Sequence, residues 1–369
     1  MKNLRIEQTN EMILDKFGMG IVEFLISQTH LASRLNSAKS ETIKRNPGYS
    51  NGDIAKAYIG LLCLGKNKFA EIEPLRSDYD FRPFLKLERV PSPAVLEHRL
   101  DEAALSEEWK QIILEESLHL LRKAGAPINP VTIQGKSFIP VDVAMPFAFI
   151  GKEGYCLSFG QETSVSVRAA EQLAEGAFLW RLEAKEGSEI AAKLLDLHID
   201  FVMKLQTDAS TWVETARKHG TCSSEREGKN VYFGSVAETN TTAGAKKPAY
   251  YVFKLIETTI DKNGQILLIP EYEADVYMTT LDIPPEAVPR LYDEHRKVCK
   301  SLIREFRFDL GFKQLPSRNQ KTNELALHFG IYAYNLLRFA GQGKARLKRI
   351  RETIRDLPKM VIKEVEAEE

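Results

Sequence analysis

Apolar positions recur at helical spacing through the first third of the chain. The clearest run covers residues 51–64, NGDIAKAYIGLLCL, and Ser50 or Asn51 can cap it. A second helix is predicted over residues 69–76, and a third begins after Ser92. Two short helices around a turn, followed by a third, are compatible with a helical bundle and with a helix-turn-helix DNA-binding module.

After residue 127 the pattern changes to short apolar strands and amphipathic helices. Three strands are predicted first, and then a helix, a strand, a helix and a strand follow in turn. In order, these segments are residues 137–147, 148–151, 155–160, 167–176, 177–184, 188–198 and 199–205. This is the element order of an RNase H-like core, although periodicity alone predicts only a mixed α/β class.

Strand patterns dominate again between residues 207 and 282. Residues 250–260 and 265–272 flank the sequence DKNG at 261–264, which is a strong hairpin signal because Asn-Gly accepts positive φ. We interpret this region as a β-rich insertion.

Helical patterns close the chain. One long helix or two are predicted over residues 284–308, and another over 322–341, capped by Thr322 or Asn323 and stopped by Gly341. Four regions are therefore expected: a helix-turn-helix-like DNA-binding domain (1–125), the first part of an RNase H-like mixed-sheet core (126–206), the β-rich insertion (207–285) and a helical completion of the core with a basic tail (286–369).

Composition excludes a few classes. The 369 residues are 43% hydrophobic and 28% charged, as in folded soluble proteins, and the length suggests more than one domain. No apolar run is long enough to span a membrane and the first residues lack a signal core, so a cytoplasmic location is expected. The cysteines form no CxxC pair and are expected to be reduced, mostly buried thiols: Cys63, Cys156, Cys222 and Cys299.

Charge is balanced overall, with 51 basic and 51 acidic residues, but one stretch is strongly basic. Between residues 338 and 355 only Glu352 is acidic, against Arg338, Lys344, Arg346, Lys348, Arg349, Arg351 and Arg355. This stretch is either the solvated face of a helix or a set of phosphate contacts.

Several strings together resemble insertion-sequence transposases of the DDE superfamily, in the branch with a β insertion before the third catalytic acid. They are YSNGDIAKAYIGLLCLGKNKFAEIE, VPSPAVLEHRLDE, IPVDV, IGKEGYCL, DKNGQILLIPEY and LPSRNQKTNELALHFGIYAYNLLRFAGQ. The resemblance covers residues 48–355. It implies an RNase H-like fold in which three carboxylates hold two Mg²⁺ ions for DNA strand cleavage and transfer.

The resemblance places the first acid at the end of the first core strand. Either Asp142 is this acid, or Ala144 occupies its place. After Phe147 the relatives have a further stretch before the next strand, and this chain passes directly to AFIGKEGYCL. The sequence therefore looks shortened beside the predicted centre.

The second acid matches Glu183, so that Asp142 and Glu183 are the predicted metal ligands. The third acid belongs to a helix with the pattern Y-x2-R/H-x3-E-x6-K. Tyr292 and His295 keep this spacing, but Cys299 stands at the glutamate position, and a thiol is a poor ligand for Mg²⁺. Glu305 is the nearest substitute, although it faces another side of the helix.

Each of these residues also has an ordinary structural interpretation. Asp142 could cap a turn, Glu183 could be a surface residue, and Glu305 could pair with Arg304 and Arg307. The candidate DNA-binding residues are Lys66, Lys68, Arg76, Arg99, Tyr292, His295, Arg304, Arg307, Lys348, Arg349 and Arg351.

Three hypotheses follow. The first is a transposase-derived protein that binds the terminal inverted repeats of double-stranded DNA but has a degraded catalytic centre. The second is an active cut-and-paste transposase that uses Asp142, Glu183 and Glu305 with Mg²⁺. The third is a non-catalytic scaffold for protein contacts. The resemblance also makes a homodimer possible.

Overall fold

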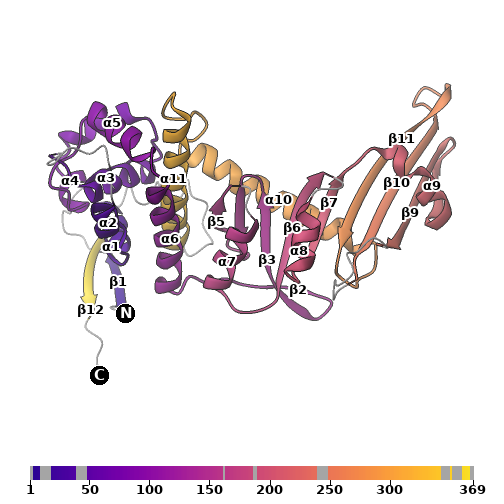
Figure 1. Cartoon of the computed structure of the whole chain (residues 1–369), viewed down its shortest axis with the longest axis horizontal. Helices are drawn as coiled ribbons and strands as arrows, with labels where there is room; N and C mark the ends of the chain where they lie inside the picture. The colour runs from indigo at the N-terminus through magenta and orange to yellow at the C-terminus, as the bar shows by residue number, and fades with distance from the viewer. Residues whose placement is uncertain are drawn as a thin grey trace. The chain divides into compact units, whose positions relative to one another are not determined.

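The computed structural model describes residues 3–8, 18–38, 48–160, 163–185, 189–238, 248–341, 350 and 360–365. They form a mixed α/β protein with a ten-stranded mixed sheet, N-terminal helices and C-terminal helices (Figure 1). The chain divides into two compact units. The first comprises Met1–Pro127, Glu153–Phe159 and Ser301–Glu369, and the second comprises Ile128–Lys152 and Gly160–Lys300.

The first unit is mainly helical. Its helices are α1 (Gly18–Ser27), α2 (Leu31–Ser37), α3 (Asn51–Cys63), the 3-10 helix η1 (Phe69–Arg76), α4 (Phe81–Phe84), α5 (Pro93–Ala103), α6 (Glu107–Ala124) and α11 (Gln320–Ala340). Its strands are β1 (Asn3–Gln8), β5 (Tyr155–Phe159) and β12 (Met360–Val365). Helix α10 (Ala287–Asp309) begins in the second unit and ends in the first.

Local capping chemistry sets two of the predicted helix starts. The Ser50 hydroxyl accepts from the Asp53 N–H at the start of α3, and the Ser92 hydroxyl accepts from the Val95 N–H at the start of α5. Residues 69–76 form a 3-10 helix rather than an α-helix, and Pro74 within it has no N–H to donate.

Two expectations for the ends of the chain are wrong. Asn319, and not Thr322 or Asn323, caps α11, because its side chain accepts from the Lys321 N–H. The predicted helical character of residues 1–125 and 286–369 fails at β1 and β12, which pair with each other in antiparallel register. Both are six-residue runs, NLRIEQ and MVIKEV, too short to show a helical period.

Helix α11 forms the centre of the first unit. Its aromatic residue Phe329 packs edge-on against Tyr58 of α3 and Trp109 of α6. The fully buried Asn335 accepts from the Cys156 N–H at 2.8 Å and donates to the Cys156 carbonyl at 2.7 Å and the Ser117 hydroxyl at 2.9 Å. A single amide thus links α11 to β5 and α6.

The second unit contains most of the sheet. Its elements are β2 (Val131–Ile133), β3 (Lys136–Ala144), β4 (Phe147–Ile150), α7 (Thr163–Leu173), β6 (Phe178–Lys185), α8 (Glu189–Asp196), β7 (Asp200–Gln206), η2 (Ala209–Trp212), α9 (Val213–His219), β8 (Thr221–Arg226), β9 (Lys229–Ala237), β10 (Tyr250–Ile260) and β11 (Ile266–Thr279). The strand order within this unit is β4-β3-β6-β7-β11-β10-β9-β8, and β2 also pairs with β3.

The strand and helix order predicted for residues 137–205 is confirmed. Strands β3, β6 and β7 are parallel neighbours, and the remaining pairs in this unit are antiparallel. The predicted hairpin is also present: Gly264 has φ +82°, and Asp261 accepts from the Asn263 and Gln265 N–H groups. Because β11 pairs with β7, the expected insertion continues the same sheet.

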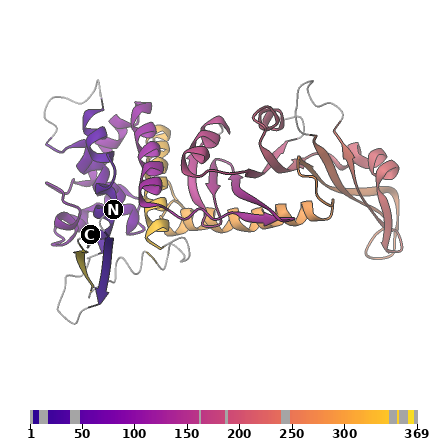
Figure 2. The ribbon, with the colours of Figure 1, turned by 90° about the horizontal axis from the view of Figure 1, so that it is seen from below.

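Helices cover both faces of the parallel strands. Figure 2 shows α10 along one face, with α7 and α8 on the opposite face. On the α10 side, Val288 and Tyr292 belong to a buried apolar cluster with Phe138, Leu179 and Val202. These apolar residues of the sheet are therefore removed from water where α10 covers them.

All four cysteines are free, and three of them are buried, whereas Cys222 is exposed.

The Asn335 amide provides a test of the first unit. Asn335→Leu leaves the Cys156 N–H and carbonyl and the Ser117 hydroxyl without this partner in a buried site. We expect it to lower the free energy of unfolding by about 3 kcal/mol, measured by urea denaturation. The control Gln111→Leu, on the exposed surface of α6, should change it by less than about 0.5 kcal/mol. Equal effects would show that the buried amide has no special role.

Candidate functional site

A row of charged side chains crosses the face of the sheet beneath α10. Asp142 of β3 lies in register with Arg181 of β6, and Glu183 of β6 lies in register with Lys204 of β7. Residues 181 and 183 are two apart on one strand, so they point to the same face. Lys204 continues the row to Asp275 of β11 through an ion pair of 2.6 Å. We call these five residues the charged row.

Asp142 is held by two partners. Arg181 donates from Nε to Oδ1 at 2.7 Å and from Nη2 to Oδ2 at 2.8 Å, so the guanidinium engages both carboxylate oxygens. The Nδ1 atom of His295 lies 2.9 Å from the same Oδ1. Asp142 is 2% exposed and Arg181 is 4% exposed, so each charge has lost its water and depends on the other.

Helix α10 supplies the other wall of the site. Tyr292, His295 and Cys299 follow at spacings of three and four, which places them on one face of the helix. The Tyr292 hydroxyl donates to Glu183 at 3.0 Å, and the Lys204 Nζ lies 5.9 Å from the centre of the Tyr292 ring. Burial first, and then the charge of Glu183, raise the pKa of Tyr292 far above its usual range, so the phenol stays protonated.

Cys299 does not form a nucleophilic dyad with His295. Burial first, and then the charge of Asp142, raise the pKa of this thiol, which keeps it neutral. Its Sγ lies 3.5 Å from Nδ1 of His295, the same nitrogen that meets Asp142. A nucleophile–His–Asp relay needs the nucleophile and the acid on opposite ring nitrogens, so this geometry does not provide one.

The arrangement does not fit the predicted pair of magnesium ions. Both oxygens of Asp142 are engaged by a fixed cation, and those of Glu183 accept from Tyr292 and from Gln206 at 3.0 Å each. Within the residues that the structure describes, no group of three His, Cys, Asp or Glu side chains is arranged to hold a metal ion. The predicted ligands Asp142 and Glu183 thus share a sheet face, and protein side chains engage the oxygens of both.

Glu305, the candidate third acid, belongs to the first unit. Its carboxylate pairs with the buried Arg338, whose Nη2 also donates to the Tyr334 hydroxyl at 2.8 Å. Burial lowers the pKa of Arg338, but Tyr334 and Glu305 outweigh this effect and raise it overall. Arg338, 33 residues away, is thus a partner of Glu305 that the expected pairing with Arg304 and Arg307 did not include.

The turn that connects β3 to β4, close to Asp142, is only two residues long. Ala144, the alternative position for the first acid, is the last residue of β3, and only Met145 and Pro146 separate it from β4. Ala144 and Asp142 are two apart, so they share a face of the sheet.

The predicted DNA-binding residues of the first unit differ in exposure. Lys68 and Arg76 are exposed, and Lys66 is half-buried. Arg99 is buried and donates to the Tyr49 carbonyl at 3.0 Å, close to the start of α3, so its guanidinium has a structural contact. On α10, Arg304 and Arg307 are exposed, whereas Tyr292 and His295 are buried. Lys348, Arg349 and Arg351 lie outside the described residues.

Sequence reasoning missed several functional candidates. Arg181 lies two residues before the predicted acid Glu183 in the run RLEA, but its role depends on the register of β3 and β6. The outer side of α10 carries four exposed basic residues in the second unit, which were also missed: Arg290, Arg296, Lys297 and Lys300. Their signal is the alternation of basic outer and apolar inner positions along the helix.

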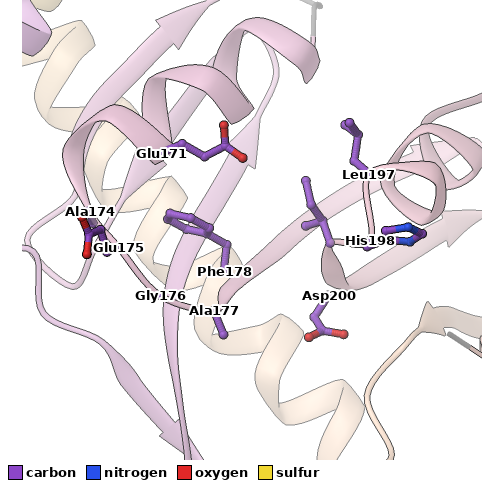
Figure 3. A pocket seen from close by; sticks show the side chains of 10 residues that line it. Glu171, Ala174, Glu175, Gly176, Ala177, Phe178, Leu197, His198 and Asp200 are labelled. Atoms are coloured by element: carbon purple, nitrogen blue, oxygen red, sulfur yellow. The ribbon is translucent and has the colours of Figure 1, made fainter. Parts of the chain in front are cut away.

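A separate cavity of about 450 Å³ opens at the first residues of β6 and β7 (Figure 3). Phe178, Leu197 and His198 line it together with three carboxylates, those of Glu171, Glu175 and Asp200. None of the residues predicted for the catalytic centre or for DNA binding is part of its lining. The charged row beneath α10 is therefore the candidate site that connects the sequence predictions with the structure.

Comparison of the chain with models of known protein families finds no match, and comparison with curated proteins finds no match. Across the described ranges, no helix has the length and apolar content needed to cross a membrane.

The ion pair of Asp142 can be tested by removing one partner. Arg181→Met leaves a buried carboxylate without its cation, and we expect the free energy of unfolding to fall by about 3–5 kcal/mol, measured by urea denaturation. Replacing both partners, in Asp142→Leu with Arg181→Met, should recover most of this loss. The control Lys193→Met removes an exposed ion pair to Glu189 and should cost less than about 1 kcal/mol. A small effect of Arg181→Met alone would refute the assigned role.

Proposed function

We propose that this protein binds double-stranded DNA as a relative of DDE transposases and does not cut it. The observation that carries the proposal is the pairing of Asp142 with Arg181 and His295. Asp142 is one of the two positions, with Ala144, that the resemblance offers for the first metal-binding acid, and here a guanidinium engages both of its oxygens. DNA binding rests on the resemblance and on the basic outer side of α10.

The absence of cutting follows from what cleavage requires. Strand cleavage by the two-metal route needs carboxylates that share divalent ions and leave positions open for a nucleophilic oxygen and a leaving oxygen. A guanidinium supplies positive charge and hydrogen-bond donors, but it cannot bind a water molecule as a Lewis acid. Glu183 accepts from Tyr292, and Glu305 pairs with Arg338. These two carboxylates therefore do not supply the metal ligands that Asp142 would otherwise provide.

The outer side of α10 suits phosphate contact. Arg290, Arg296, Lys297 and Lys300 are exposed, and the acidic residues among them are Asp293 and Glu294. The opposite side of the helix is fixed against the sheet by His295 and Tyr292. Exposed basic side chains on a helix that is held in place can contact successive phosphates without an ordering cost for the backbone.

The partner that we propose is duplex DNA carrying the terminal inverted repeats of an insertion sequence, bound by a monomer or a homodimer. The active transposase with a displaced metal site and the protein-interaction scaffold remain as outcomes of the two tests below.

DNA binding can be tested on α10. The double variant Lys297→Gln with Lys300→Gln should weaken binding to a duplex, and the slope of log K against log salt should become smaller by about 2, since each lost phosphate contact removes about 0.9. Filter binding across a salt series measures both quantities. The control Lys218→Gln with Lys262→Gln removes two exposed lysines elsewhere in the second unit and should leave the slope unchanged. If the wild-type protein binds DNA without salt dependence, the scaffold hypothesis is favoured.

Cleavage can be tested directly. We expect no strand cleavage of DNA carrying the terminal repeats when Mg²⁺ or Mn²⁺ is added, as measured on denaturing gels, because the Arg181 guanidinium engages both oxygens of Asp142. If the wild-type protein does cleave and Asp142→Ala abolishes the cleavage, the protein is an active transposase and our proposal is wrong.

A further inference from the structure

The cavity at the first residues of β6 and β7 lies within the second unit and contains no residue of the charged row. Its volume is about 450 Å³, within the range of roughly 300–1,000 Å³ that small-molecule sites occupy. Two connections form its walls: residues 174–177, between α7 and β6, and residues 197–199, between α8 and β7. Because β6 and β7 are parallel neighbours, both connections reach the same end of the sheet.

Hydrogen bonds hold both walls in place. The Ile139 N–H donates to the Ala177 carbonyl at 2.8 Å, which ties the first connection to β3. The Ile199 N–H donates to a carbonyl in α8 at 3.0 Å, which ties the second connection to that helix. Asp200 accepts from the Thr280 hydroxyl at 3.0 Å. The fold itself therefore forms the cavity, and a ligand does not have to order its walls.

The lining carries more negative than positive charge. Three carboxylates line the cavity, those of Glu171, Glu175 and Asp200, and none of the described lining residues is lysine or arginine. Like charges around one cavity repel one another, and a bound cation relieves this repulsion. The lining therefore favours a positively charged ligand over an anion.

The lining also offers apolar surface. Figure 3 shows Glu171 and Phe178 on one side of the cavity and Leu197 and His198 on the other. A metal ion such as Mg²⁺ cannot use Phe178 or Leu197, because hard cations take oxygen ligands. A carbon chain can pack against both side chains, and the face of the Phe178 ring attracts an ammonium group. The ligand that uses the whole lining is a cation with an apolar stem.

We propose that this cavity binds a small organic amine. Its ammonium groups pair with Glu171, Glu175 and Asp200, and its carbon chain packs on Phe178 and Leu197. Linear polyamines such as spermidine combine these two features. Because Glu171 and Glu175 are exposed, water screens their ion pairs, and the affinity is moderate. This inference does not depend on the proposed function, since the cavity is separate from the charged row and from the basic side of α10.

Calorimetric titration of the full chain with spermidine, in the absence of DNA, tests the proposal. We expect saturable one-to-one binding. The double variant Glu171→Gln with Asp200→Asn removes two negative charges and should weaken this binding about tenfold. The amide oxygen at position 200 can still accept from Thr280, so the wall of the cavity is retained.

The matched control is Glu227→Gln with Glu271→Gln, which removes the same charge from exposed positions of the second unit outside the cavity. It should leave the affinity for spermidine unchanged. Equal weakening by the two double variants would show that spermidine only follows the net charge of the protein, and the proposal would be wrong. A titration of the wild-type protein without saturable binding would also overturn it.

Competition separates an amine from other cations. Ammonium chloride carries the charge without the carbon chain, and Mg²⁺ carries more charge without apolar surface, so each should need at least about a tenfold higher concentration than spermidine to occupy the cavity. Displacement of spermidine by an equal concentration of either ion would overturn the proposal.

A free polyamine and the lysine side chain of a protein share this chemistry. A short lysine-containing peptide, titrated in the same way, distinguishes these two sources. Tighter binding of either probe supports the site and identifies the source of the amine, whereas binding of neither contradicts the proposal.

Discussion

The buried ion pair between Asp142 and Arg181 is the interaction on which the arrangement of the second unit depends. Moving either charge into the interior costs several kcal/mol, and this cost is offset only when the geometry is close to ideal. The parallel register of β3 and β6 provides that geometry, because it sets the two residues side by side on one face. Helix α10 packs on this charged surface. Its His295 contacts Asp142 and its Tyr292 donates to Glu183, whereas its other residues on this side are mainly apolar.

This ion pair also determines what chemistry the site can support. A divalent ion would offer the carboxylate two charges and open coordination positions, whereas a guanidinium offers one charge and a rigid set of donors. Arg181 therefore engages both oxygens of Asp142 as a structural partner, which is the basis of our proposal that the site does not hold a catalytic metal. The neutral thiol of Cys299 beside His295 is consistent with this view, since it supplies neither a hard ligand nor an active nucleophile.

The sequence predicted many helices and strands well, but it did not predict which side chains contact the candidate acids. Periodicity and caps act over a few residues, so α3, α5, β10 and the turn after β10 were predicted close to their observed bounds, whereas β11 continues to Thr279, beyond the predicted end at residue 272. The partner of Asp142 is 39 residues away and that of Glu305 is 33 residues away, and both depend on how whole elements pack. A search for acids alone could not indicate that arginines would meet them.

The same limit applies to DNA binding, where residue type alone does not separate surface from interior. Arg99 looked like a contact residue, but it is buried and stabilises the start of α3, while Lys297 and Lys300 went unnoticed on an exposed surface. Helix α10 shows why the distinction matters. One side carries the groups that hold it on the sheet, and the other carries free basic side chains. Because the two sets share one rigid helix but touch different surroundings, loss of metal chemistry on the inner side does not require loss of phosphate contact on the outer side. A chain of this kind can therefore lose cleavage and keep binding, and the two properties can be separated by mutation.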